Sequence, residues 1–231
     1  MELRTHGGKR PGAGRKPNGV KAGQSHEQRP KLRASRPVHV TLRVAADLRQ
    51  LRTRDLYLAI RRATVAVAGR DDFRIVHLGI QRDHLHLIVE ADGRLELSRG
   101  VRAFEISAAR HVNRAVSRAR RSRRSGAVFP DRYHARILNS PTSVRNAIRY
   151  VVNNWRKHHE DRAALLREFP IDPFSSGISF TGWRELARRA WLWRPPTTYQ
   201  PLRVCRPRTW LLERGWQLAG SVGTRDVPGS I

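Results

Sequence analysis

The chain lacks several features that would assign it to a familiar class of protein. Among its 231 residues there is one cysteine, Cys205, which excludes a disulfide framework within the chain and a cysteine-cluster zinc site. No stretch approaches the roughly 20 continuous apolar residues of a membrane-spanning helix, and the N-terminus has no apolar signal core. Acidic residues are scarce, with 19 Asp and Glu against 46 Lys and Arg. These absences predict a cytoplasmic protein without a membrane partner.

The most prominent feature of the composition is an excess of basic residues. The formal charge of +27 at pH 7 is far more than solubility requires, and it creates a positive field over the surface. A polyanion is therefore the expected partner, and nucleic acid is favoured over an acidic membrane surface. We expect association with the bacterial nucleoid.

Composition divides the chain into three expected parts: a disordered basic tail at 1–36, a main domain at 37–159 and an appendage at 160–231. The tail carries ten Lys or Arg against two Glu, with many Gly and Pro and little to bury. Its segment "GAGRKP", with Arg15 and Lys16, resembles the core of arms that enter a DNA minor groove. Nonspecific attraction to phosphates is the simpler interpretation, and we prefer it to entry into a minor groove.

Hydrophobic periodicity predicts the elements of the main domain. Alternation with period two predicts strands, and helical spacing predicts helices, in the order 38–44, 47–68, 73–81, 84–90, 97–121, 133–138 and 141–159. Asp47 is the expected cap of the first helix, and Ser140 with Pro141 should open the last one. In the second strand, we expect Val76, Leu78 and Ile80 to share one face.

The order β-α-β-β-α-β-α is that of an α+β, ferredoxin-like fold. It predicts one antiparallel sheet with the first two helices on one face and the other face open for a ligand.

The third strand carries two histidines with one residue between them. Period two places Leu85 and Leu87 toward the helices and projects His84 and His86 from the open face, where both rings can reach one metal ion. Alone, such a pair is weak evidence, because two solvated surface histidines would look the same. The last helix adds Tyr150 and Asn154, which are neighbours at i, i+4.

These motifs together resemble the single-tyrosine HUH transposases, most closely the REP-associated tyrosine transposase branch. The resemblance spans roughly 36–159, and its motifs match in type, order and spacing: "HVTLR", the His-Leu-His strand, a long basic helix, "GAVFPDRYHARIL" and "YVVNN". One departure is that the family's Tyr-x-x-x-Asn-Pro has Trp155 in place of the proline. The helix should therefore run on beyond Asn154.

The resemblance implies the chemistry and the role of each residue. It implies that His84, His86 and Asn154 hold a divalent ion, Mg²⁺ or Mn²⁺, and that Tyr150 is the nucleophile. Attack on single-stranded DNA, beside a hairpin, would leave a 5′-phosphotyrosine and a free 3′-hydroxyl. Imidazole ligands make manganese the tighter-bound ion. The number of subunits that build the site, one or two, stays open, and Tyr133 is the next candidate nucleophile.

Basic residues near these motifs are expected to bind DNA phosphates in a salt-sensitive way. Besides the two in the tail, they are Arg43, Arg120, Arg121, Arg123, Arg124, Arg132 and Lys157. The appendage contains Trp183, Trp191, Trp193, Trp210 and Trp216, interleaved with arginines. These rings can stack on unpaired bases or form a small core that docks on the main domain, and docking is preferred.

Two other functions remain as alternatives. A non-enzymatic, domesticated protein could bind single-stranded nucleic acid on the same open sheet, although such proteins usually present aromatic side chains there. A two-histidine phosphoesterase would use His39-Val40-Thr41 and His84-Leu85-His86 as an acid and a base without metal. Its second motif, however, has a histidine where a hydroxyl is needed.

Overall fold

The computed structural model describes residues 31–162 and 168–229, and Arg15 and Lys16 lie outside them. Its strands and longer helices follow the predicted order and are β1 Val38–Arg43, α1 Arg54–Val67, β2 Phe73–Ile80, β3 His84–Ala91, α2 Arg94–Arg120, β4 His134–Ile137 and α3 Pro141–Lys157. A short helix, α4 Trp210–Glu213, follows in the C-terminal part. The sheet is antiparallel with strand order β2-β3-β1-β4, so the predicted α+β, ferredoxin-like fold is confirmed.

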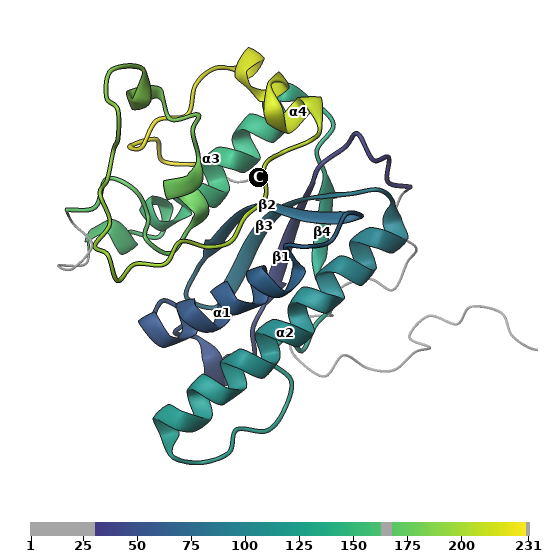
Figure 1. Cartoon of the computed structure of the whole chain (residues 1–231), viewed down its shortest axis with the longest axis vertical. Coiled ribbons are helices and arrows are strands. Elements are labelled where there is room, and N and C mark those ends of the chain that lie inside the picture. Colours follow the sequence, from purple (N-terminus) through teal and green to yellow (C-terminus); the bar gives the residue numbers. More distant parts are fainter. Residues whose placement is uncertain (1–30, 163–167, 230–231) are drawn as a thin grey trace, which may run out of the picture.

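Helices α1 and α2 lie side by side on one face of the sheet (Figure 1). Between them and the sheet lies the first core, in which the largest fully buried side chains include Phe73, Phe104, Leu85 and Leu87. Both leucines of the His-Leu-His-Leu segment thus face the helices, as the alternation predicts.

The other face of the sheet is less open than expected. A second core forms there between the sheet, α3 and the C-terminal part; it contains Val76, Ile88, Leu138, Val144, Ala147, Ile148, Val151, Val152, Ile171, Phe180, Trp183, Leu211, Leu212, Trp216 and Val222. The apolar stripe of α3 covers this face because it has no other surface on which to bury itself. What remains accessible is the end of the sheet that carries the histidines.

Two local predictions were wrong. The first helix starts at Arg54 rather than near Asp47, because Thr53 is its cap and accepts a hydrogen bond from the Leu56 amide. In β2, a bulge between Ile75 and His77 adds one residue to the strand. Val76 therefore faces the second core, away from Leu78 and Ile80.

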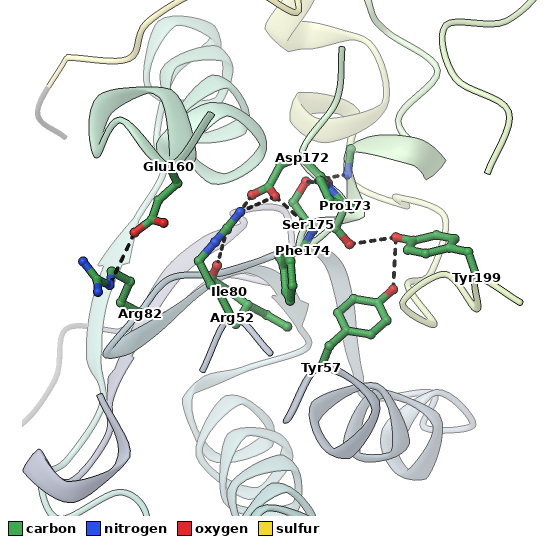
Figure 2. Close-up of polar contacts among 11 residues, drawn as sticks. Arg52, Tyr57, Ile80, Arg82, Glu160, Asp172, Pro173, Phe174, Ser175 and Tyr199 are labelled. Atoms are coloured by element: carbon green, nitrogen blue, oxygen red, sulfur yellow. Dashed lines mark hydrogen bonds and ion pairs between the residues drawn. The ribbon is translucent and has the colours of Figure 1, made fainter. Parts of the chain in front are cut away.

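The C-terminal part covers the outer edge of β2. The amide of Ile80 donates to the carbonyl of Phe174 at 2.9 Å, and the amide of Cys205 donates to the carbonyl of Ile75 at 2.8 Å. Arg52, ahead of α1, forms two hydrogen bonds with the carboxylate of Asp172, and both side chains are almost fully buried (Figure 2). An edge strand that would otherwise expose its backbone is thus paired within the chain.

The tryptophans of this part divide into two groups. Trp183 and Trp216 belong to the second core and Trp193 packs against it, whereas Trp191 and Trp210 are 52% and 56% exposed. Within the described ranges, no helix combines the length and apolar character needed to cross a membrane.

Candidate active site

Three strands bring polar side chains into two adjacent rows on the face beneath α3. In one row, His86 of β3 lies between Thr41 of β1 and Gly79 of β2; in the next, His84 lies opposite Arg43. Cross-strand partners point to the same face of a sheet, so these side chains meet.

The two predicted histidines face each other. Their Nε2 atoms are 2.9 Å apart, which matches the separation of about 3.0 Å expected for neighbouring ligands of an octahedral ion with bonds of about 2.1 Å. The outer nitrogens have partners that fix the rings: Nδ1 of His84 lies 2.6 Å from Asp83, and Nδ1 of His86 lies 3.2 Å from both His39 and Thr41. Such partners orient metal-binding imidazoles in proteins.

Burial keeps His86 and its neighbour His39 neutral. The pKa of His86 lies well below its usual 6.5, first because the ring is buried and then because His39, His84, His158 and Lys157 are close. Burial likewise lowers the pKa of His39 to about 4. A neutral imidazole is the form that binds a metal ion, so the site is prepared for a cation near neutral pH.

Helix α3 brings Tyr150 to the histidines. Ser140 and Ser143 form a capping box, and Pro141 occupies the first turn, so the sequence fixes where the helix starts. The ring centroid of Tyr150 lies 4.9 Å from that of His86 and 6.0 Å from that of His39.

The surroundings of Tyr150 decide how readily it loses its proton. Burial raises the pKa of its phenol above 10, and the Asn154 amide offsets part of this effect. The Nζ atom of Lys157 lies 5.3 Å from the centre of the ring. An unassisted phenol with a raised pKa is a poor nucleophile, so the site must supply charge that favours the phenolate.

Asn154 lies on the same helix, one turn after Tyr150. Its side chain is fully buried, and neither amide atom has a hydrogen-bond partner of ordinary geometry in the described part of the chain. Tyr150 is thus at most a weak partner of this buried amide, and a bound ion would satisfy the amide oxygen. Two neutral imidazoles and one amide oxygen therefore fit a divalent cation. The described residues contain no group of three or more His, Cys, Asp or Glu side chains that could hold a metal.

The helix can approach this closely because β2 has a glycine under it. A side chain at Gly79 would collide with the carbonyl of Val151, the residue after Tyr150. Further along, the ring of His158 lies 6.3 Å from that of His84. Helix α3 thus runs toward the β2–β3 turn, and Asn154 lies between these two contacts. The helix continues to Lys157, as expected from the replacement of proline by Trp155.

The predicted DNA-binding residues differ in their surroundings. Arg43 is exposed beside His84, and Arg120, Arg121, Arg123 and Arg132 are exposed around the end of α2 and the start of β4. Arg124 is different, because its side chain is 4% exposed and bonds to Asp47, Asn113 and two carbonyls. Arg124 is therefore a structural residue, and we withdraw it as a phosphate contact. Tyr133, the alternative nucleophile, packs in the first core.

Sequence reasoning missed three residues near the site. Asp83 orients His84, and His158 and Gln81 line a pocket of about 410 Å³ next to His84. Asp83 could have been suspected because it precedes the first histidine directly. His158 could not, since its position depends on the path of α3 over the sheet.

Comparisons with known proteins identify the family of the chain. The family of IS200-like transposases matches residues 37–154, which is more than half of the chain and includes all four predicted site residues. The chain belongs to this family and is a DNA transposase. Transposases of this family are generally metal-dependent. No curated protein matches the chain.

Two solved structures match the chain. A REP-associated tyrosine transposase bound to a REP hairpin has 18% sequence identity and a TM-score of 0.50, and the match covers 80% of this chain and 99% of that one. A putative transposase from Deinococcus radiodurans R1 has 15% identity and a TM-score of 0.37, over 60% of this chain and 96% of that one. The first shows that the fold extends over most of this chain.

Proposed function

We propose that this transposase cleaves and rejoins single-stranded DNA through a 5′-phosphotyrosine on Tyr150, as a member of the REP-associated branch. His84, His86 and Asn154 would hold the divalent ion. The observation that carries the proposal is the position of the Tyr150 ring, 4.9 Å from the ring of His86, whose Nε2 faces that of His84 at 2.9 Å. A nucleophile and a cation site thus meet within one chain.

Each residue of the site has its own role in the proposed reaction. The Tyr150 oxygen attacks the scissile phosphorus, the bond from phosphorus to the 3′ oxygen breaks, and that oxygen takes up a proton and leaves as a 3′-hydroxyl. Lys157, close to the phenol ring, favours loss of the phenol proton. A bound divalent ion would offset charge on the phosphate oxygens, and imidazole ligands favour Mn²⁺ over Mg²⁺. A second 3′-hydroxyl can reverse the attack, which joins new ends without ATP.

The proposed substrate is a single strand next to a DNA hairpin. The similar REP-associated transposase was solved with a REP hairpin, and this chain has exposed arginines beside its site and at the end of α2. Arg43 is well placed for the strand near the scissile phosphate, because it lies opposite His84. Arg120, Arg121, Arg123 and Arg132 would hold phosphates further away.

The test is covalent capture of DNA. Wild-type protein incubated with labelled hairpin DNA and Mn²⁺ should form an adduct that survives a denaturing gel. Tyr150→Phe should form none, and Tyr133→Phe, which changes a tyrosine of the first core, should form it as the wild type does. An adduct that persists in Tyr150→Phe and disappears in Tyr133→Phe would contradict the proposal.

The cation site has a test that does not depend on activity. Mn²⁺ should raise the melting temperature of the wild type, because a ligand that binds the folded state stabilises it. The double variant His84→Ala, His86→Ala should show no such shift. An equal shift in both proteins would place the ion elsewhere.

We also propose that one chain completes its own site, since both halves come from the same chain. Mixing the Tyr150→Phe protein with the His84→Ala, His86→Ala protein should then give no adduct. Recovery of adduct in the mixture would instead indicate a site shared between two chains.

A further inference from the structure

A pocket opens beside the candidate cation site, between the β2–β3 turn and the end of α3. It measures about 410 Å³, within the range of about 300–1,000 Å³ for small-ligand sites. His84 forms part of its wall, so whatever occupies the pocket lies next to the proposed position of the scissile phosphate. Gln81 is also in its wall, and we call it the Gln81 pocket.

Gln81 has an amide that the folded chain does not use. Its backbone amide donates to the carbonyl of His84 at 2.9 Å, which makes the two residues cross-strand partners with side chains on the same face. The residue is only 2% exposed, and neither polar atom of its side chain has a hydrogen-bond partner among residues 31–162 and 168–229. Each such atom costs about 1–3 kcal/mol. Because both atoms are buried, the amide has to turn toward the pocket to meet a ligand, and a ligand that supplies both partners would recover this cost.

The remaining wall carries charges of both signs. Arg49 and Arg82 contribute cations, and Asp83 and Glu160 contribute carboxylates. Arg82 and Glu160 form an ion pair of 3.6 Å between the β2–β3 turn and the residues after α3 (Figure 2). A phosphate site would be lined by cations, because carboxylates repel phosphate. A neutral group that has both donors and acceptors fits this wall better.

We propose that the Gln81 pocket binds one unpaired nucleobase next to the scissile phosphate and that Gln81 reads its edge; this inference rests on the proposed function. Enzymes that act on nucleic acids commonly take an unstacked base into such a pocket. A glutamine amide offers one donor and one acceptor side by side, which is the complement of adenine N7 and N6. Adenine is therefore the expected base.

Binding without cleavage tests this proposal separately from the proposed function. Full-length protein, kept free of divalent ions, is equilibrated with random single-stranded DNA of about 12 nucleotides, and the bound strands are sequenced. The wild type should enrich adenine at one position, and fluorescence anisotropy on individual strands should give a preference of about 5- to 100-fold there. A protein that forms no phosphotyrosine can still show this preference.

Three variants sharpen the result. Gln81→Leu should reduce the preference to less than about twofold without lowering the melting temperature, because no hydrogen bond within the chain is lost. Gln81→Glu, which only accepts, should shift the preference toward cytosine, whose N4 donates. Gln217→Leu replaces an exposed glutamine of the turn Gly215–Ala219 and should keep the wild-type preference.

Two outcomes overturn the inference: a wild type without base preference, and a Gln81→Leu protein with the wild-type preference. If that Gln81→Leu protein has also lost the Mn²⁺-induced rise in melting temperature, Gln81 is a ligand of the ion instead.

Discussion

Buried imidazoles on the second face of the sheet connect the stability of this protein to pH. His39, His77 and His86 are each at most 7% exposed. Two of them belong to the candidate site, whereas His77 packs against Phe180 and lies 3.4 Å from the hydroxyl of Ser176. The effect of His77 on the free energy of unfolding can therefore be measured without changing the candidate cation site.

Stability should fall in acid because of His77. Burial lowers the pKa of His77 from 6.5 to about 4 in the folded protein. Above pH 6.5 the ring is neutral in both states; between pH 6.5 and 4 only the unfolded chain gains the proton, so the free energy of unfolding drops, and below pH 4 the loss is complete. The loss is about 3 kcal/mol.

Chemical denaturation at pH 7 and pH 4.5 measures this effect. His77→Asn should lose less stability between the two pH values than the wild type. His159→Asn, which replaces an exposed histidine with a left-handed backbone, should lose as much as the wild type. Equal losses in the wild type and His77→Asn would show that other groups set the acid sensitivity.

At the scale of elements, the C-terminal part stabilises the fold by closing the edge of β2. Its contact with the main domain includes the ion pair of Arg52 and Asp172, whose side chains are 5% and 1% exposed. Arg52 also donates to the carbonyl of Ile80 at 2.8 Å, so this arginine joins the C-terminal part to the end of β2 (Figure 2).

Breaking this ion pair should destabilise the whole protein. Asp172→Ala leaves a buried guanidinium without its carboxylate, which costs about 3–5 kcal/mol. Asp72→Ala removes the partner of Arg70 in a pair whose side chains are each about one third exposed, and it should cost about 1 kcal/mol or less. Urea denaturation followed by circular dichroism compares the two variants. A small effect of Asp172→Ala would mean that the C-terminal part is not coupled to the domain.

Sequence periodicity predicted the elements well where each one buries a single regular face. The His-Leu-His-Leu strand and the capped helix from Pro141 are examples, because local alternation and a capping box decide both. The predictions were wrong where one extra residue in a strand, or a contact between residues far apart in the sequence, determines the structure. The bulge near Val76 shifts the strand by one position, and Thr53 takes the capping role because Asp47 bonds to Arg124. The covering of the second face depends on residues far away in the sequence.

At the scale of the whole molecule, the charge of +27 makes DNA binding depend steeply on salt. Some of the 46 Lys and Arg are nevertheless paired with acidic residues within the chain, as the contacts of Arg124 with Asp47 show. Arg123, its exposed neighbour, is available to phosphates. Adjacent arginines of the same run thus have different roles, which composition alone cannot distinguish.

The salt dependence of DNA binding should distinguish the role of Arg123 from that of Arg124. Arg123→Ala should reduce the slope of log affinity against log salt concentration by about 0.7 for single-stranded DNA and leave the melting temperature unchanged. Arg124→Ala should keep the slope and lower the melting temperature by about 2–4 °C. Anisotropy titrations at several salt concentrations give the slopes, and an unchanged slope in Arg123→Ala would remove it from the DNA-binding surface.

Gly79 should control the rate of cleavage through the distance between α3 and the sheet. Gly79→Ala places a methyl group against the carbonyl of Val151 and must move α3 and the sheet apart. A displacement of about 1 Å between reacting groups costs about 100-fold in rate. Adduct formation over time measures this loss, and Gly69→Ala, where a side chain meets nothing within 4 Å, is the control. An unchanged rate in Gly79→Ala would show that α3 tolerates the displacement.

Because the close approach of α3 depends on the absence of a side chain at Gly79, one substitution there is enough to leave the transposase nearly inactive during evolution. If the proposed function holds, a single codon change at Gly79 moves Tyr150 away from the cation site while the exposed arginines persist. The descendant would still bind DNA but would cut it far more slowly, so a host would gain a nearly inactive DNA-binding protein from a mobile element's enzyme in one step.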